Sequence, residues 1–299
     1  MEQIIKSVDL DYNALADCTQ KLCDTYSFLS AGSIGKSAVG RDIISLSLGS
    51  GRAVLFAAAF HGCESITGSV VLRFVERLCR AASDGRDIAG FDARQILRTR
   101  QLVVIPRVNP DGCEIALHGA DTAGAFADKV RRIAGGYPER WDANARGVDI
   151  NHNFDAGWQR LRKLEQDAGI HGPSARRYGG MRPHSEPETA ALVTLCEQIS
   201  FGISAAFHSQ GEVIYWSYGA NTPPRSRRLA NLFAASSGYA LEQPSGLASH
   251  GGFKDWVIDK LHRPAFTVEL GRGTNPLPAA QLDSIYDRVE EMLALMCIL

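Results

Sequence analysis

Four short apolar runs stand out along the chain, and each leads into polar residues. They are AVLFAAAF at 53–60, QLVVIP at 101–106, ISAAF at 203–207 and AFTVEL at 265–270. Apolar runs of this length, bounded by turn residues, predict buried strands.

Helical patterns lie between and after these runs. Residues 66–81 place Val70, Phe74 and Leu78 on one face, residues 186–198 follow Ser185, and a third pattern covers 279–299. Strands alternating with helices predict an α/β fold, with a largely parallel sheet covered by helices on both faces. Ligands of such folds bind at the carboxyl ends of strands.

The stretch 119–182 is rich in Gly, Asp and Arg and only weakly periodic. We expect it to form an elaborated loop over the site. Because no linker is evident, we expect 1–299 to be a single domain, in which the first residues, about 25 of them, form a lead-in helix or extension.

Composition narrows the function classes. The chain has 299 residues, 45% hydrophobic and 22% charged, with a net charge of -1, so we expect neither a nucleic-acid partner nor a membrane. Seven cysteines, an odd number without close pairing, favour free thiols. The N-terminus lacks the apolar core of a signal peptide. We therefore expect a cytoplasmic protein.

Metal-binding side chains follow two of the predicted strands. His61 and Glu64 come after the first apolar run, and His208 ends the third. Two imidazoles and one carboxylate can hold zinc and leave a position open for water, which is typical of a catalytic site. Two alternatives stay open: a solvated turn at 61–64, and a core histidine at 208 whose nitrogens are satisfied by backbone.

Glu269 ends the fourth apolar run. A carboxylate at a buried strand end needs a partner or a task. It can act as the general base that takes a proton from the attacking water, or it can form a salt bridge with Arg272 or Arg263.

Residues 147–154 collect Asp149, Asn151, His152 and Asn153 in one short segment. A metal-bound histidine usually donates its other N–H to a carboxylate, and Asp149 is a candidate for that acceptor. Asn151 is a candidate for binding a substrate carboxylate or carbonyl. The alternative is a polar turn whose side chains cap backbone groups.

A segment at 30–37, SAGSIGKS, is similar to a phosphate-binding loop. Ser30 stands where the first glycine is needed, and no apolar strand precedes it. We expect no nucleotide site there.

Taken in order, these pieces resemble the zinc carboxypeptidase family over about residues 26–290. The motifs are HGCE at 61–64, NPDG at 109–112, GVDIN at 147–151, SEPET at 185–189, HS at 208–209, GGFKDW at 251–256 and FTVE at 266–269. The segments WDANARGVDIN at 141–151 and ELGRGTNPLP at 269–278 are more similar to one bacterial branch, the γ-D-glutamyl-meso-diaminopimelate peptidases.

The resemblance implies a mixed sheet of about eight strands. It also implies one zinc ion on three ligands, a general base, a carboxylate behind the first histidine and an asparagine on the substrate carboxylate. The residues that would fill these roles are His61, Glu64 and His208 for zinc, Glu269 as base, Asp149 behind His61, and Asn151.

The chain departs from the family at three positions. His152 stands where the family often has an arginine that pairs with a terminal carboxylate, Cys63 stands where another arginine is frequent, and Leu247 stands where digestive members carry a mobile tyrosine. The carboxylate clamp is therefore incomplete or rebuilt. Arg146 is the first candidate for a replacement cation and for polarising the scissile carbonyl, and Arg140 is the second.

The resemblance also implies that Lys254, just before Asp255-Trp256, lies at the base of the side-chain pocket, where it would select a carboxylate. The alternative is a solvent-exposed lysine paired with a nearby acid.

The expected activity is hydrolysis of the γ-D-Glu–diaminopimelate amide in small murein-derived peptides. Two alternatives are an amidohydrolase or deacylase acting on N-acyl amino acids, and a non-catalytic domain that binds cell-wall peptides.

Overall fold

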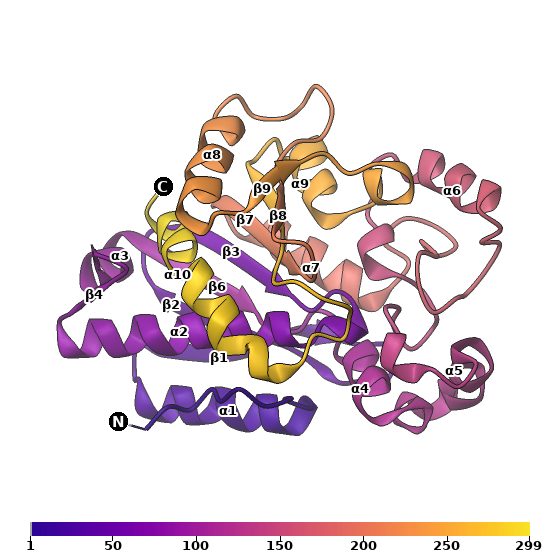
Figure 1. Cartoon of the computed structure of the whole chain (residues 1–299), viewed down its shortest axis with the longest axis horizontal. Helices are drawn as coiled ribbons and strands as arrows, with labels where there is room; N and C mark the ends of the chain where they lie inside the picture. The colour runs from indigo at the N-terminus through magenta and orange to yellow at the C-terminus, as the bar shows by residue number, and fades with distance from the viewer. Residues whose placement is uncertain (1) are drawn as a thin grey trace.

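The fold is built around one mixed sheet, as seen in a computed structural model that describes residues 2–299 (Figure 1). Its eight strands run in the order β1-β2-β6-β3-β7-β10-β8-β9. They are β1 (Leu29–Lys36), β2 (Asp42–Gly49), β3 (Arg52–Ala58), β6 (Arg100–Ile105), β7 (Phe201–His208), β8 (Val213–Tyr215), β9 (Ala240–Glu242) and β10 (Ala265–Glu269). A separate two-residue ladder pairs β4 (Asp87–Ile88) with β5 (Phe91–Asp92).

Neighbouring strands β6, β3, β7 and β10 run parallel in the middle of the sheet. The pairs β1–β2, β2–β6 and β10–β8 are antiparallel. The expected α/β fold with a mixed, mostly parallel sheet is confirmed. The four apolar runs became these four central strands because they are buried on both faces.

The remaining strands lie toward the two edges of the sheet and had no comparable signal. β1, with sequence LSAGSIGK, buries only Leu29 fully. The segment similar to a phosphate-binding loop therefore belongs to an edge strand.

Helices cover both faces of the sheet. Val54, Phe56 and Ala58 of β3 enter one apolar cluster, and the alternate residues Ala53, Leu55 and Ala57 enter a second. The first cluster includes residues of α1 (Tyr12–Thr25), α2 (Ile66–Asp84), α8 (Ser226–Ser237) and α10 (Leu282–Ile298), and α2 and α10 cross that face in Figure 1. The second includes residues of α7 (Pro187–Gln198) and α9 (Phe253–Leu261). The short helix α3 (Ala93–Thr99) leads into β6.

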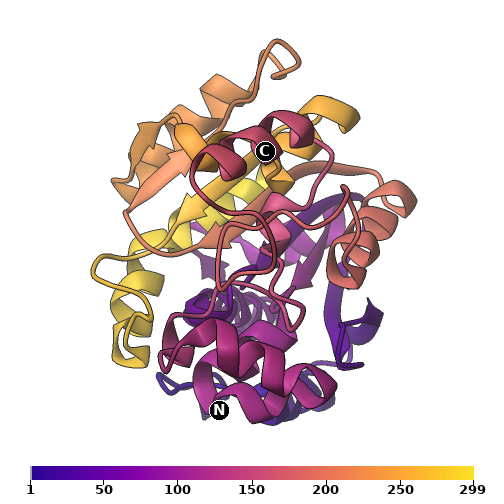
Figure 2. The same ribbon diagram turned by 90° about the vertical axis from the view of Figure 1, so that its right-hand side faces the viewer.

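Residues 110–185 occupy one end of the molecule, on the right in Figure 1 and toward the viewer in Figure 2. This part contains three α-helices, α4 (Pro110–His118), α5 (Ala127–Ala134) and α6 (Trp158–Asp167), besides three short 3-10 helices. The stretch expected to be loop therefore includes two short helices, α5 and α6. Each buries at most two side chains, which explains the weak periodicity.

Within residues 2–299, none of the helices has the length and apolar character that a membrane span requires.

Candidate metal centre and active site

The carboxyl ends of β3, β7 and β10 bring the chemistry to one edge of the sheet. β3 leads through Phe60 into His61, His208 is the last residue of β7, and Glu269 is the last residue of β10. Because β10 and β7 are parallel and in register, Glu269 pairs directly with His208. Apolar strands that end on polar residues thus place three reactive side chains together, as the sequence predicted.

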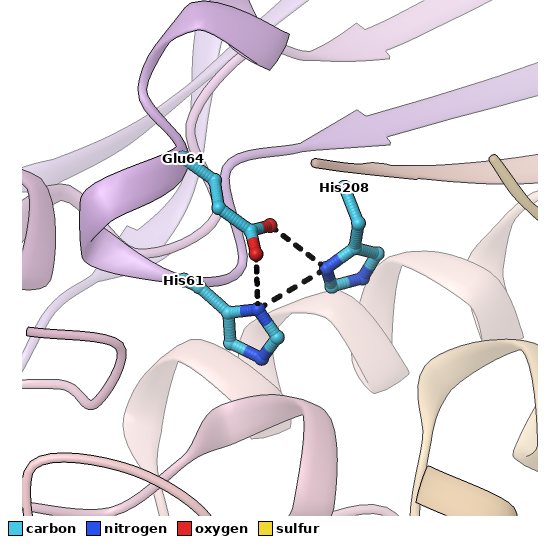
Figure 3. A group of neighbouring side chains, drawn as sticks. All are labelled: His61, Glu64 and His208. Atoms are coloured by element: carbon cyan, nitrogen blue, oxygen red, sulfur yellow. Dashed lines mark hydrogen bonds and ion pairs between the residues drawn. The ribbon is translucent and has the colours of Figure 1, made fainter. Parts of the chain in front are cut away.

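His61, Glu64 and His208 form a compact donor set (Figure 3). The Nδ1 atom of His61 lies 2.9 Å from one carboxylate oxygen of Glu64, and the Nδ1 atom of His208 lies 3.1 Å from the other. The two Nδ1 atoms are 3.3 Å apart.

The spacing of these donors fits zinc. Tetrahedral zinc with bonds of about 2.0–2.1 Å separates its ligand atoms by about 3.3 Å. Two imidazole nitrogens and a carboxylate are also ligands that zinc prefers. The predicted one-ion zinc site on His61, Glu64 and His208 is therefore confirmed as a candidate metal site by its donor geometry.

The contacts of the His61 ring are a second reason to expect a bound cation at this site. The Nε2 atom of His61 lies 3.2 Å from Asp149 Oδ1, an acceptor, so Nε2 carries the proton. In the neutral ring Nδ1 then presents a lone pair to the Glu64 carboxylate, a contact that only a proton or a metal cation makes favourable. Burial opposes protonation of His61, but Glu64 and Asp149 outweigh it and raise the pKa of His61.

Asp149 is well fixed in this position. Its Oδ2 accepts the backbone N–H of Arg177 at 3.0 Å, and its Oδ1 accepts that of Asn151 at 3.1 Å. Burial disfavours ionisation of Asp149, but the His152 and His61 rings and these hydrogen bonds hold the pKa of Asp149 well below its usual range. The charged carboxylate can therefore orient the His61 ring.

Close backbone packing fixes the turn that carries Glu64. Gly62 donates to Asp142 O at 3.1 Å, and a Cβ at position 62 would lie 2.2 Å from Gly112 O, so only glycine fits. The Asn109 side chain ties Phe60 O, Asp142 O and Ala143 O together and caps α4. Asn109 therefore helps to fix the backbone that leads into His61 and the loop at 142–143 that packs against it.

Glu269 shares the cavity with the donor set, and no described residue between 2 and 299 forms a hydrogen bond with its carboxyl group. The salt bridges considered for Glu269 are not formed: Arg272 pairs with Glu212, and Arg263 donates to Ile199 O. Removal from bulk water and the Glu64 carboxylate raise the pKa of Glu269 to about 8, although His61 opposes the shift. A carboxyl group that ionises near neutral pH suits proton transfer.

One cavity of about 640 Å³ contains the metal donors. All but one of the other site residues expected from the sequence also line this cavity. They are Asp149, Glu269, Asn151, His152, Arg140 and Lys254. The exception is Arg146, whose guanidinium lies over the Phe126 ring and 3.8 Å from Glu186, away from the cavity. Of the two arginines considered, the structure brings Arg140 to the site.

Asn151 and His152 each use one polar atom to hold their position. Asn151 Oδ1 accepts the backbone N–H of Phe253 at 3.0 Å, so its amide N–H groups remain for a ligand. His152 Nδ1 lies 2.9 Å from Arg177 O, which makes Nδ1 the protonated atom. Burial lowers the pKa of His152, but Asp149 and Glu165 outweigh burial and raise it.

Lys254 is 4% exposed and lines the cavity. Its ammonium donates to Ser217 O at 2.8 Å, contacts the Asp255 carboxylate and lies 5.7 Å from the centre of the Tyr218 ring. Burial raises the pKa of Asp255 in spite of Lys254. The pairing with an acid was expected as an alternative, but the lysine is buried and does not point to bulk solvent.

Sequence reasoning missed several groups in the cavity. Asn275 donates to Ser209 O at 2.7 Å and to Glu64 Oε1 at 3.3 Å, so it helps to orient a metal donor. It lies in the segment 269–278 that resembled the bacterial branch, which was the available signal. Arg176 and Asp142 also line the cavity, and the weakly periodic loop offered no signal for Arg176.

Comparison with known proteins agrees with this geometry. Residues 15–292 match the family described as zinc carboxypeptidase. The chain is 35% identical over 281 residues to a γ-D-glutamyl-L-diamino acid endopeptidase 1 of Lysinibacillus sphaericus, covering 92% of this chain and 69% of that protein.

Two solved structures share the fold. A thrombin-activatable fibrinolysis inhibitor aligns with a TM-score of 0.74 at 18% identity, over 99% of this chain and 76% of its own. A murein-tripeptide amidase of Escherichia coli O157 aligns with a TM-score of 0.56 at 21% identity, over 90% of this chain and 92% of its own.

Proposed function

This chain belongs to the zinc carboxypeptidase family, and from that premise we propose that it cleaves the amide bond between γ-linked D-glutamate and a diamino acid in murein-derived peptides. The enzyme class, a zinc metallopeptidase, follows from the family. The observation that carries the proposal is the donor set of His61, Glu64 and His208 in one cavity with Glu269. The similarity to a γ-D-glutamyl-L-diamino acid endopeptidase supports the substrate class.

Zinc held by these ligands would polarise the scissile carbonyl and lower the pKa of a water molecule. We propose that Glu269 takes a proton from that water at its carboxylate oxygen and later delivers it to the leaving amine. Asp149 holds the His61 ring in the tautomer whose Nδ1 carries the lone pair. A base and a fixed set of metal donors in one cavity are the groups that this route of amide hydrolysis requires.

The polar residues around the metal donors and Glu269 are the candidates for binding the substrate. We propose that Asn151 and His152 bind a carboxylate on the amine side of the scissile bond, because both line the cavity. Asn151 offers its amide N–H groups, and His152, whose pKa is raised, offers Nε2–H as an imidazolium. Lys254 would bind the distal carboxylate of diaminopimelate. Arg140 would face the scissile carbonyl oxygen, because Arg140 lines the cavity whereas Arg146, the first choice from the sequence, pairs with Glu186 and does not line it.

Two broader proposals accompany this one. We propose that 1–299 acts as a single peptidase domain, since one eight-stranded sheet, covered by helices on both faces, forms the body of the fold. We also propose a cytoplasmic role in processing murein peptide fragments, because all seven cysteines are free thiols. Isolation of the native protein from outside the cell with paired cysteines would contradict the second proposal.

The test incubates the zinc-loaded protein with L-Ala-γ-D-Glu-meso-diaminopimelate and identifies the products by mass spectrometry. We expect L-Ala-D-Glu and free diaminopimelate, no reaction after chelation, and recovery on adding zinc. Cleavage at the L-Ala–D-Glu bond, or turnover only of N-acyl amino acids, would contradict the proposed substrate.

A further inference from the structure

Arg176 offers the cavity a further cationic group, separate from Lys254 and Arg140. Its Nε and Nη2 atoms both bind Asp142, the Nη2 contact being 2.8 Å. The Asp142 carboxylate is 8% exposed, whereas the Arg176 side chain is 57% exposed and lines the cavity. Within residues 2–299, Nη1 of Arg176 has no hydrogen-bond partner, so one edge of the guanidinium faces the cavity solvent.

Asp142 places this guanidinium beside the metal donors. The other Asp142 oxygen accepts the thiol of Cys63 at 3.0 Å, and Cys63 lies in the turn between His61 and Glu64. The backbone on both sides is also fixed, because Gly62 donates to Asp142 O and Cys63 to Trp141 O. Arg176 is therefore held at a set position next to the turn that carries Glu64.

The loop does not need the Arg176 side chain as an anchor. Backbone N–H groups of Asp142 and Ala143 both donate to Ala175 O at 2.9 Å. The next residue, Arg177, bonds Asp149 through its N–H and His152 through its carbonyl. Since backbone bonds hold the loop on either side of Arg176, its half-exposed guanidinium remains available for a ligand.

Lys254 and Arg176 are held by different carboxylates on different segments, Asp255 in α9 and Asp142 beside the metal turn. The proposed substrate likewise has carboxylates on both sides of the scissile amide. In a γ-linked glutamate the α-carboxylate stays free on the acyl side, separated from the scissile carbonyl by two methylene groups and the α-carbon. An α-linked peptide has an anion at this separation only where its acyl-side residue is itself a glutamate.

We infer that Arg176, held by Asp142, binds the free α-carboxylate of the γ-linked glutamate on the acyl side of the scissile bond. The inference rests on the proposed function and makes Arg176 a residue that distinguishes a γ-linked glutamate with a free carboxylate from its amide or from an uncharged residue. A carboxylate that pairs with the open edge of a guanidinium forms charge-assisted hydrogen bonds, which are strong and directional.

The test compares two peptides that differ only at this carboxylate, L-Ala-γ-D-Glu-meso-diaminopimelate and its α-amide, the D-isoglutamine peptide. We expect the wild type to prefer the acid about tenfold or more in kcat/KM, mainly through KM, as one charge-assisted contact implies. Arg176→Gln should reduce this preference to about twofold or less. Arg132→Gln, an exposed arginine of α5, should keep the full preference.

Two kinetic results would overturn the inference. Arg176→Gln would slow both peptides equally if the arginine acted on the carbonyl oxygen or only stabilised the loop. Loss of the acid preference in Arg140→Gln but not in Arg176→Gln would assign the contact to Arg140.

Binding of the acyl fragments separates this inference from the proposed reaction. Calorimetry on the zinc-loaded protein would compare L-Ala-D-Glu with L-Ala-D-isoglutamine. Tighter binding of the acid that disappears in Arg176→Gln supports the anion site even if the tripeptide is not cleaved, an outcome that would contradict only the proposed reaction. Equal binding of both fragments by the wild type would overturn the anion site.

Discussion

Glu269 and His208 are register partners on the parallel strands β10 and β7, so the proposed base and a metal donor lie side by side at one edge of the sheet. The sheet therefore sets the distance between proton acceptor and metal site, because the rigid ladder fixes both strand ends. Sites carried by strands are held more firmly than sites carried by loops.

We predict that Glu269→Gln keeps zinc and loses turnover. The amide has nearly the shape of the carboxylate but cannot accept the proton, so kcat should fall by about 10²–10⁴. Turnover on the tripeptide and zinc content by atomic absorption check this, with Glu291→Gln on the exposed side of α10 as a matched control. Near-normal kcat in Glu269→Gln would move the base to another residue.

Removing the carboxylate behind His61 should weaken metal binding. In Asp149→Asn the His61 ring loses the partner that fixes its tautomer, and we expect zinc affinity to fall about 10–100-fold. Competition with a fluorescent chelator measures this, and circular dichroism shows whether the overall secondary structure is retained. Asp167→Asn, at the exposed end of α6, should bind zinc normally. An unchanged zinc affinity in Asp149→Asn would remove Asp149 from this role.

Lys254 should separate diaminopimelate from lysine at the amine side of the substrate. The two amino acids differ by the distal carboxylate, and we expect the wild type to prefer the diaminopimelate peptide about tenfold or more. Lys254→Met should remove that preference. The variant remains foldable because the pKa of Asp255 is already raised by burial, so Asp255 can take up a proton.

Two measurements decide this point. Kinetics on the lysine and diaminopimelate tripeptides give the preference, and thermal melting of Lys254→Met shows that the fold persists. If both peptides are cleaved equally by the wild type, and Lys254→Met changes neither rate, Lys254 has no part in specificity.

Glu188 should make stability depend on pH. It is fully buried and accepts hydrogen bonds from Ala38 and Asn144. Burial, reinforced by Asp111, raises the pKa of Glu188 to about 7, although the bond from Ala38 opposes this. Because the folded pKa exceeds the unfolded value, the stabilising contribution is complete below about pH 4.5 and is lost as the pH rises through about 7.

Glu188→Gln does not titrate and should lack this dependence. The free energy of unfolding of the variant minus that of the wild type should therefore rise by about 3 kcal/mol between pH 4 and pH 8. Urea unfolding at both pH values measures it, and any fixed effect of the amide cancels in the comparison. A difference that stays constant with pH would show that the pKa of Glu188 is the same in the folded and unfolded states.

Local patterns in the sequence determined the central sheet and the metal donors. Each central strand is an apolar run buried on both faces, and hydrophobic burial is encoded by neighbouring residues alone. His61, His208 and Glu269 follow such runs directly, and parallel strands bring their carboxyl ends to one edge. These positions could therefore be placed without knowing how the loops pack.

Only the tertiary structure decided which cations serve the cavity. Arg140, Arg146 and Arg176 lie in segments with little periodicity, and nothing local distinguishes the arginine over Phe126 from the one held by Asp142. Asn275 reaches Glu64 from a position 211 residues away. Such contacts depend on how loops far apart in sequence pack against one another. Side-chain direction in these loops is set by backbone bonds like those at Ala175, which no hydrophobic period records.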